Sequence, residues 1–477
     1  MSDAADRDAA PRLRRSLGTL DLVLMTVAAI ISFRWLSLAA QIGPSSLTLW
    51  VLGMLTFFVP SALTVLELSS RLPGEGGIYI WCKAAFGDLH AFVVGWSYWV
   101  SNLVFFPSLL LFIAGVLLYV RGGSGLALAD SALYNGGVCL AVLWSATLLN
   151  ILGLDRAKWL QNVGGVATWL AGAMILAGGA LAWHEWGSAT SFTRAALIPD
   201  FSSLRTLASF AAMALAYVGL ELGPILGGEI RNPRPTIARA VLIACLVVPV
   251  LYVAGTAALL VALPAGEINM ISGIPQSLAA VGARLDLRSF GAVTAALVAL
   301  SQVGTLGAWV AGTARLPFLF GLDRYLPRAV GALHPRFGSP YVALLVQSVI
   351  TTLILLSALS GSAIHEAFLV LIDMSIILGL IPLVYMFAAL PVLRRRAGGL
   401  PAAGSPLPRG PWICWLVAAS GIAVTLLAAV AAMIPPTESA NPALIALKVV
   451  GGSALLLGIG LACFVRGRSL HRPMLAG

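Results

Sequence analysis

The sequence predicts an all-α polytopic membrane protein of about twelve transmembrane helices. Of its 477 residues, 59% are hydrophobic and only 10% are charged, whereas a soluble domain has about 25% charged residues. Apolar stretches of about 20 residues, the length that crosses the hydrocarbon core as a helix, recur along almost the whole chain. The loops between them offer too little polar surface to cover so many apolar helices in water, so a soluble protein is excluded.

These stretches define twelve expected spans. They lie near 17–42, 46–70, 89–119, 134–153, 159–183, 206–228, 237–263, 289–320, 339–359, 366–391, 411–434 and 443–465. An even number of spans puts both termini on one side. The moderately polar stretch 265–288 predicts short external helices. Three consecutive arginines followed by Pro, Gly and Ser make 394–410 a linker.

The expected organisation therefore has five parts. These are an N-terminal tail (1–16), a ten-helix transport core (17–393), a cytoplasmic linker (394–410), a terminal helix pair (411–465) and a C-terminal tail (466–477). The polar, Arg-rich start leads into a full-length apolar segment without a small-residue cleavage site. We therefore expect a retained first helix and not a signal peptide.

The formal charge of +10 reflects which loops and tails lie on the cytoplasmic side of the membrane. Most Lys and Arg residues fall in the two tails and in alternate loops, which marks those segments as cytoplasmic. The opposite loops hold only Arg121, Arg194, Arg205, Arg284, Arg288 and Lys448. Both termini are thus expected inside the cell, with the protein in the inner (plasma) membrane. The excess predicts contact with anionic membrane lipid and no nucleic-acid partner.

The five cysteines suggest neither a metal nor a cofactor. Cys82, Cys139, Cys245, Cys414 and Cys463 lie in or beside apolar segments, and no two form a CxxC pair. They are interpreted as small buried hydrophobic residues.

Two expected spans are interrupted at similar positions. The first contains Ser32, Phe33, Arg34 and Trp35, and the sixth contains the run GLELGP over 219–224. Five spans separate the two interruptions, and an odd number reverses orientation, so the halves of the core would be inverted copies. Polar or Gly/Pro interruptions at matching positions of two halves indicate a transporter binding site.

A broken helix offers main-chain groups that a continuous helix keeps for itself. Its free N–H groups suit a carboxylate and its free C=O groups suit an ammonium or a cation. Gly219, Gly223 and Pro224 provide the chemistry for the second break. The alternative is a Pro kink without a ligand.

Arg34 and Glu221 fall at the two predicted breaks. An ionisable group near the bilayer centre costs about 2.5–3.5 kcal/mol on insertion scales, so it usually has a partner or a wet cavity. Arg34 would then attract an anionic group, and Glu221 would carry a proton or act as a gate. The alternative is a permanent Arg34–Glu221 ion pair, and a pair that opens during transport would serve both roles.

Other polar and aromatic residues complete the predicted site. Asp373 in the tenth span is a second proton candidate, or else a charge near the external mouth. Tyr98, Asn102 and Trp309 could line the pathway, although aromatic residues on membrane helices more often only pack.

Several short motifs in the sequence indicate a family resemblance. They are ELSSRLPGEGGIYIW over 67–81, AFG over 85–87, GW over 95–96, GEIRNP over 228–233, AR over 314–315 and DRYLP over 323–327. In these motifs the chain resembles the amino acid–polyamine–organocation (APC) superfamily. The runs GEIN over 266–269 and GIPQ over 273–276 are most similar to its glutamate/γ-aminobutyrate antiporter branch.

The resemblance implies a five-plus-five inverted repeat, discontinuous helices 1 and 6, and alternating access coupled to protons or a counter-substrate. Carried over, the run from Ser32 to Trp35 and the residues Val218, Gly219, Leu220 and Glu221 would surround an amino acid, with Trp309 packed on it. Two departures stand out. Bulky residues replace the small Gly-Ser-Gly-like break of many members, so Arg34 would take over part of its work. Thr168 stands where several proton-coupled members have Lys, which makes Glu221 the better proton candidate.

The alternatives to an amino acid carrier are a membrane-embedded enzyme, an ATP-driven pump, a channel and a polyamine carrier. A membrane-embedded zinc enzyme would need HExxH, but the His-Glu pairs at 184–185 and 365–366 lack the second His. An ATP-driven pump would need a phosphate-binding GxxxxGK[ST] loop, and a channel would show a short filter-like repeat. The sequence contains neither. A polyamine or organocation carrier of the same superfamily stays open as an alternative. Oligomeric state is not predicted.

Overall fold

The structure, a computed structural model, describes residues 13–269, 273–287, 289–360, 362–432 and 442–471. Within these ranges the chain is built of helices, with one isolated bridge between Leu17 and Ile230 in place of a sheet. The predicted all-α fold is confirmed.

The helices follow one another along the chain with short connections. The first half contains α2 (Thr19–Ile30), α3 (Phe33–Ile42), α4 (Ser45–Gly53), the π-helix η1 (Met54–Phe58), α5 (Val59–Arg71), α6 (Ile78–Phe86), α7 (Asp88–Leu117), the 3₁₀-helix η2 (Leu118–Leu128), α8 (Ala132–Ile151), α9 (Leu154–Trp186) and α10 (Arg194–Leu197). The second half contains α11 (Leu204–Leu215), α12 (Leu222–Ile225), η3 (Gly227–Glu229), α13 (Pro233–Ala262), η4 (Ala265–Glu267), α14 (Gly273–Arg284), α15 (Phe290–Leu322), η5 (Arg328–Gly331), α16 (Tyr341–Ala358), α17 (Ser362–Arg396), α18 (Pro411–Ala432) and α19 (Pro442–His471).

Each of the twelve predicted spans has a helical counterpart. In the described part of the chain, 11 segments are long and apolar enough to cross a membrane. The sixth predicted span, 206–228, is not among them because it is split into α11 and the short α12. The predicted polytopic class is therefore confirmed, and η4 and α14 are the short helices expected in 265–288. The inverted repeat and the division into transport core and terminal pair stay predictions.

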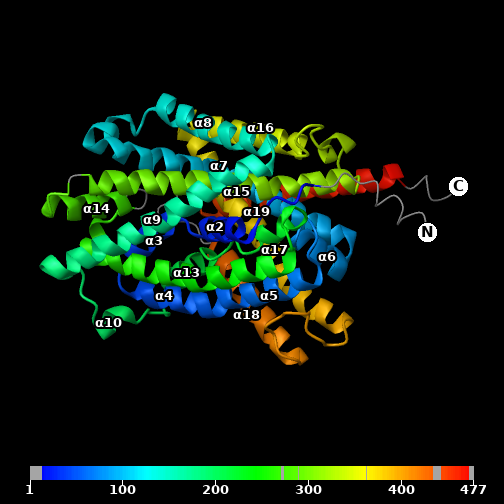
Figure 1. Cartoon of the computed structure of the whole chain (residues 1–477), viewed down its shortest axis with the longest axis horizontal. Helices are drawn as coiled ribbons and strands as arrows, with labels where there is room; N and C mark the ends of the chain where they lie inside the picture. Colours follow the sequence, from blue (N-terminus) through cyan, green and yellow to red (C-terminus); the bar gives the residue numbers. More distant parts are fainter. Residues whose placement is uncertain (1–12, 270–272, 288, 361, 433–441, 472–477) are drawn as a thin grey trace.

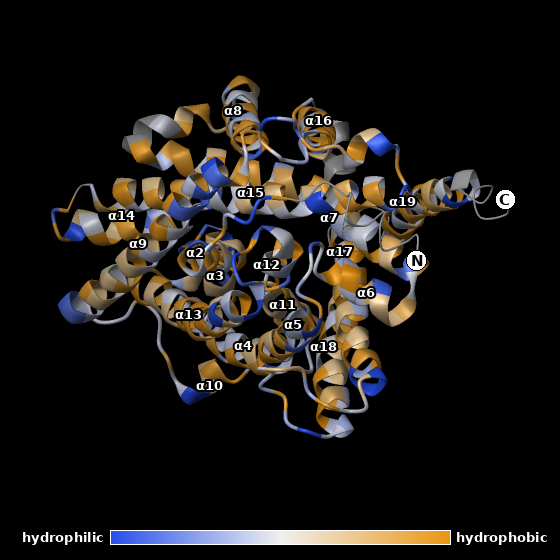
Figure 2. Ribbon diagram, turned by 45° about the vertical axis from the view of Figure 1, so that its right-hand side comes forward, coloured by the Kyte–Doolittle hydropathy of each residue, from blue (hydrophilic) through white to orange (hydrophobic). Residues whose placement is uncertain are grey.

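The broken helices lie in the middle of the bundle. Figure 2 shows α2, α3 and α12 surrounded by α13, α15, α17 and α5, with apolar residues on the outward faces of the bundle. In Figure 1 the start of α2 and the end of α19 lie at the same end of the molecule. We call this end, which also holds the loop 72–77 and the segment 226–231, the termini end.

Close backbone contact fixes α9 against α15. A Cβ atom added to Gly164 would lie 2.5 Å from the Cα atom of Gly304, so both positions require glycine for this crossing. Small residues allow membrane helices to approach closely and gain dispersion contacts that lipid cannot replace. The α9–α15 pair thus forms a tightly packed support beside the broken helices.

A buried ion cluster joins the segment after α17 to α5. Glu67 is fully buried, and its Oε1 lies 2.6 Å from Nη2 of Arg71 and 3.3 Å from Nη1 of Arg394. The same oxygen accepts the N–H of Ala402 at 3.1 Å, and Arg394 donates to the carbonyl of Pro408 at 2.6 Å. The cluster therefore ties α5, the end of α17 and the segment that leads to α18 together at one point.

We expect Glu67→Ala to lower the free energy of unfolding by about 3–5 kcal/mol, because it leaves the buried Arg394 guanidinium without its carboxylate. Thermal unfolding of the detergent-purified protein measures the loss. Glu185→Ala, which removes a carboxylate that is 49% exposed, is the matched control and should unfold at the wild-type temperature. Equal stability of both variants would contradict the anchoring role.

Candidate functional site

The first span is interrupted between α2 and α3. Ile31 (φ −73°, ψ 102°) and Ser32 (φ −107°, ψ 113°) are both extended, so the helical hydrogen bonds stop there. The last carbonyls of a helix lack backbone donors, and the hydrocarbon region has no water to replace them. Four side chains supply the donors instead: Thr305 to Ala28 O (2.8 Å), Trp309 to Ala29 O (3.1 Å), Tyr252 to Ile30 O (2.8 Å) and Gln302 to Ile31 O (3.4 Å).

The other side of this break is the start of α3. Its N-cap residue, Ser32, makes no side-chain capping hydrogen bond. Its side chain donates to Gln302 Oε1 at 3.5 Å instead. The first N–H groups of a helix have no acceptor within the helix and carry a partial positive charge. The break therefore has occupied carbonyls on one side and uncapped amides on the other, which favours an anionic group.

The second span is interrupted between α11 and α12. Gly219 has φ 134°, a conformation that residues with a Cβ atom rarely adopt. The carboxylate of Glu221 accepts the N–H of Gly219 at 3.1 Å and the hydroxyl of Tyr98 at 3.0 Å. Glu221 is only 2% exposed. Its side chain thus satisfies the backbone of this break and joins it to α7.

The two breaks touch each other. A Cβ atom on Gly219 would lie 3.0 Å from Cγ1 of Ile30. The hydroxyl of Tyr252, on α13, lies 2.8 Å from Ile30 O and 3.0 Å from Ala216 O. A hydroxyl has one proton, so Tyr252 donates to the first break or to the second, one at a time.

A cavity of about 450 Å³ lies beside the breaks. Its lining comes from α3, α7, α11, α15, α17 and α18, together with the ends of both breaks. The predicted site residues on it are Ser32, Arg34, Trp35, Tyr98, Asn102, Val218 and Trp309. Most of the remaining wall is apolar, including a row of alanines on α11 (Ala208, Ala211 and Ala212). The size and the few polar groups are those of a small-molecule site.

Comparison with known proteins identifies the family to which this chain belongs. Residues 17–455 match the family described as amino acid permease. The chain belongs to this family. The resemblance stated from the motifs is thereby confirmed.

The permease also has relatives along most of its length. It is 28% identical over 426 residues to an uncharacterised transporter of Legionella pneumophila, covering 89% of this chain and 91% of the relative. It is 26% identical over 405 residues to a serine/threonine exchanger of Bacillus subtilis (81% and 85% covered). It is 25% identical over 344 residues to a glutamate/γ-aminobutyrate antiporter of Lactococcus lactis (71% and 68% covered). The protein is thus a transporter of amino acids or related small amines and not an enzyme, as predicted.

Arg34 of the permease stands in the cavity wall, and no carboxylate among the described side chains pairs with it. Its Nη1 donates to Ser108 Oγ at 3.2 Å, and its guanidinium lies 5.0 Å from the ring centre of Trp35 and 5.5 Å from that of Phe105. No described acidic group lies within 4.0 Å of it. The alternative of a permanent Arg34–Glu221 ion pair is therefore wrong for this conformation, because the two side chains bind different partners.

Four predicted site residues lie outside the cavity wall. Phe33 and Leu220 are buried, and Gly219 and Glu221 lie behind Tyr98 in the second break. Their contact with a substrate stays a prediction. Asp373 lies in α17, but its side chain is outside the described residues.

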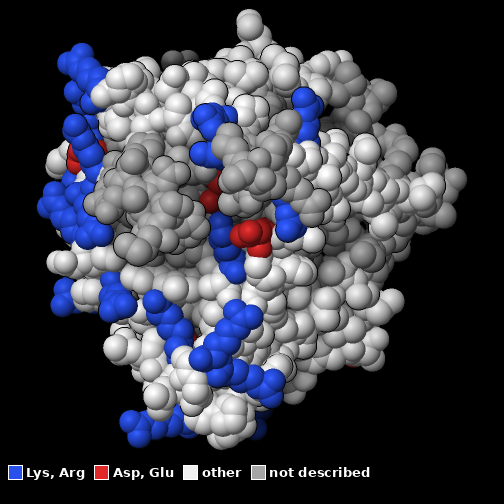
Figure 3. All heavy atoms as spheres, turned by 90° about the vertical axis from the view of Figure 1, so that its right-hand side faces the viewer, with Lys and Arg blue, Asp and Glu red and all other residues white. Residues whose placement is uncertain are grey.

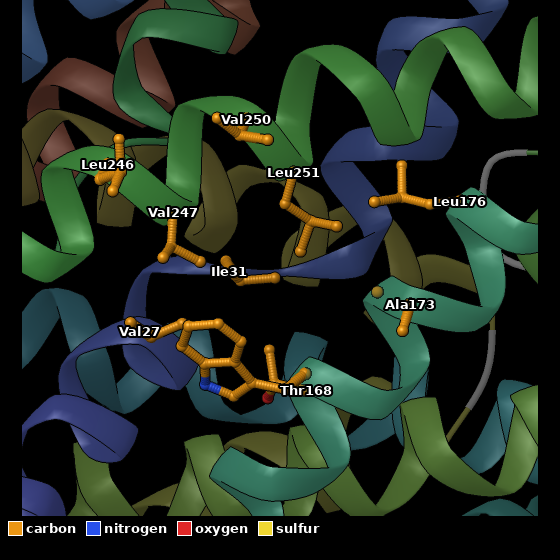
Figure 4. Close-up of a pocket in the computed structure, with 11 residues that line it drawn as sticks. Val27, Ile31, Thr168, Ala173, Leu176, Leu246, Val247, Val250 and Leu251 are labelled. Carbon is orange, nitrogen blue, oxygen red and sulfur yellow. The ribbon is translucent and has the colours of Figure 1, made fainter.

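A second pocket, of about 310 Å³, opens between α9 and α13 (Figure 4). Val27 and Ile31 of the first break form one side of it, facing Val247 and Leu251 of α13 across the pocket. None of its lining residues is charged. The hydroxyl of Thr168, at the position of the missing Lys, is paired with Ser301 Oγ at 2.6 Å. This pocket therefore offers no charged group to a zwitterion.

Sequence reasoning missed Tyr252. It is one more aromatic residue on an apolar helix, stacked 4.3 Å from the ring of Trp50, and the chain gives no local signal that its hydroxyl reaches both breaks. Gln302 and Thr305 were missed for the same reason. Their partners at the first break lie more than 270 residues away in sequence.

We expect Tyr252→Phe to weaken substrate binding about tenfold, because a buried carbonyl at one of the breaks would lose its donor, a loss of about 1–3 kcal/mol. Tyr134→Phe is the matched control, since the Tyr134 hydroxyl donates to Ala114 O of α7 at 2.9 Å, away from both breaks. Ligand-induced thermal shifts of both variants measure the difference. Equal affinity in the two variants would rule out a special role for Tyr252.

Proposed function

We propose that the permease carries a zwitterionic amino acid across the membrane by alternating access, with the carboxylate bound at the start of α3. The observation that supports this most directly is the asymmetry of the first break. The carbonyls at the end of α2 are already engaged by side chains, whereas the start of α3 has uncapped amides beside the Arg34 guanidinium. A charge-assisted bond to Arg34 would add both strength and direction.

The rest of the cavity suits the other parts of an amino acid. Asn102 donates its amide nitrogen to Tyr98 O at 2.7 Å, which leaves its amide oxygen as an acceptor for an ammonium group. The alanines of α11 and the rings of Phe105 and Trp309 form an apolar wall. We therefore favour a neutral amino acid with an apolar side chain.

A polyamine or other organocation carrier is the second candidate. The relatives in Lactococcus lactis include a probable agmatine/putrescine antiporter beside the glutamate/γ-aminobutyrate antiporter. Arg34 opposes it, because a fixed guanidinium in an apolar wall repels a second cation, and a like charge in low dielectric is costly. Counterflow in proteoliposomes separates the two. Preloaded neutral amino acids should drive uptake of the labelled amino acid, and preloaded putrescine should not.

Transport would be coupled to protons through Glu221, or would proceed by exchange with a counter-substrate. As a carboxylate, Glu221 accepts hydrogen bonds from both Gly219 and Tyr98. Protonation turns one of its oxygens into a donor, to which the Tyr98 hydroxyl can respond by accepting. A proton would replace the charge-assisted bond between the second break and α7 with a weaker neutral one, and so loosen the second break from α7. Asp373 remains the second proton candidate.

The termini end would face the cytoplasm of the cell and the permease would lie in the inner membrane, in contact with anionic lipid. Lys and Arg side chains gather on this face, with few acidic groups among them (Figure 3). Exposed members of this set are Arg231, Arg234, Arg395 and Arg396. A cation excess marks the cytoplasmic side. The cavity is lined by α3 and α11, the halves of the broken helices that point away from this end, so it would serve the external side.

We expect Arg34→Ala to reduce uptake of the amino acid about 10- to 100-fold, the loss that corresponds to one charge-assisted hydrogen bond of about 1.5–3 kcal/mol. Initial rates in proteoliposomes over a range of substrate concentrations measure it. Arg205→Ala is the control, because Arg205 is exposed near the start of α11 and does not line the cavity. Wild-type uptake by Arg34→Ala would remove the carboxylate site.

We expect Glu221→Gln to abolish substrate-driven proton movement, because an amide cannot take up the proton, while exchange of one amino acid for another continues. A pH-sensitive dye inside the vesicles and labelled exchange report the two activities separately. Tyr98→Phe removes the same hydrogen bond but leaves the carboxylate, so it should keep proton movement. If Glu221→Gln moves protons as the wild type does, Asp373 or pure exchange replaces Glu221 in the mechanism.

A further inference from the structure

The pathway is closed at the termini end by two segments that pack backbone to backbone. The N–H of Gly76 donates to Ile225 O at 2.9 Å. A Cβ atom on Gly227 would lie 2.4 Å from Gly74 O. None of these residues lines the cavity. The loop 72–77 and the segment 226–231 thus form a separate closure, well away from the proposed substrate site.

The start of α2 is tied to the same closure. The N–H groups of Ser16 and Leu17 donate to Glu229 O at 2.8 and 3.0 Å, and the N–H of Arg231 donates to Leu17 O at 2.9 Å. The base of α2 is thus bonded to the segment 226–231, so a movement of that segment would carry with it the half-helix that leads to the first break.

The closure contains one buried cation. Arg315 of α15 is 1% exposed, and its Nη2 lies 2.7 Å from Oε1 and 3.0 Å from Oε2 of Glu229. Its Nε adds a bond of 3.2 Å to the same carboxylate, and its Nη1 donates to Ala311 O. The guanidinium is thus committed to Glu229.

Glu75 brings a second carboxylate to this one cation. Its Oε2 accepts the N–H of Gly228 at 2.7 Å. Its Oε1 is buried, makes no hydrogen bond to a described residue, and lies 4.0 Å from Arg315 Nε, at the outer limit of an ion pair. A buried carboxylate oxygen without a donor is unfavourable, and a proton on Oε1 would remove the surplus charge. The side chain is 15% exposed, so water can deliver that proton.

We propose that Glu75 is a proton-binding site that locks the termini end of the pathway, closed when Glu75 is protonated and released when it is ionised. The proposal rests on the alternating-access function proposed above, because the lock controls exit at one end. Ionised Glu75 would repel Glu229 and draw water between the loop 72–77 and the segment 226–231.

The charges around Glu75 determine whether the closed state is favoured at low or at high pH. The charged groups that face it are Glu229 and Arg315, and Asp155 at the start of α9 acts in turn on Glu229. Burial, and then Glu229, raises the pKa of Glu75 from an ordinary value of 4.5 to about 8, although Arg315 and the Gly228 amide oppose the rise. If Glu75 has its ordinary pKa in the open state, the equilibrium constant for closing has its largest value below pH 4.5. This constant then falls about tenfold per pH unit until about pH 8 and stays constant at higher pH.

Hydrogen–deuterium exchange of the full-length protein in detergent, without substrate, tests the lock. Protection of peptides covering 72–79 and 225–232, which contain the Gly76 and Gly228 amides that bond across the closure, is measured at pH 5.5, 6.5, 7.5 and 9 and corrected for intrinsic exchange rates. The wild type should lose protection about tenfold per unit up to pH 8, and Glu75→Gln should stay protected throughout. Glu185→Gln, which changes an exposed carboxylate, should behave as the wild type.

A second variant gives a result that a purely structural ion pair would not. Glu229→Gln removes the repulsion and frees Arg315 to pair with Glu75, so the loss of protection should move to lower pH. A wild type without pH dependence, a Glu75→Gln protein that keeps it, or a Glu229→Gln protein with an unshifted transition would each overturn the proposal. Because no substrate is present, failure of the amino acid uptake assay would not affect this outcome, and the two proposals fail separately.

Discussion

The structure depends on how main-chain groups are satisfied where two membrane helices are broken. Each break exposes carbonyl and amide groups at a depth where water cannot reach them, and an unsatisfied group there costs several kcal/mol. The carbonyls of the first break are held by α13 and α15 through Tyr252, Gln302, Thr305 and Trp309. Within the second, the amide of Gly219 is held by Glu221. The breaks persist because neighbouring helices provide these donors and acceptors.

This dependence explains which parts of the site were predictable from the sequence. The spans follow from apolar length, and the positions of the breaks follow from local composition, with Ser32 at one and Gly219 at the other. Tyr252, Gln302 and Thr305, which stabilise the first break, were not predictable, because a Gln, Thr or Tyr on an apolar helix gives no local indication of a partner on another helix. The alternative of a permanent Arg34–Glu221 ion pair rested on similar depth alone. Similar depth does not imply contact, and in this conformation Arg34 binds Ser108 and lies near two aromatic rings.

The contacts also divide the molecule into parts that would move and parts that would not. The glycine crossing of α9 and α15 leaves no room for sliding, since Gly164 and Gly304 already meet backbone to backbone. The two breaks contact each other at Gly219 and Ile30, and Thr305 and Trp309 of α15 donate hydrogen bonds to the first break. Hydrogen bonds of this kind can be exchanged one at a time at modest net cost. On the proposed mechanism the hydrogen bonds at the breaks would be the ones to exchange, and Tyr252, within reach of both breaks, would keep the two in step.

The two buried carboxylates would respond to a proton in opposite ways. Glu221 already has a donor on each oxygen and no described cation beside it, so a proton there replaces charge-assisted hydrogen bonds with weaker neutral ones and loosens the site. Glu75 has a donor on one oxygen only and shares one cation with Glu229. A proton on its other oxygen therefore removes the surplus negative charge and tightens the closure. On the proposed mechanism, acid would free the second break at the cavity while holding the termini end shut. Opening both ends at once, which would turn a carrier into a leak, is then disfavoured at any pH at which Glu75 is protonated.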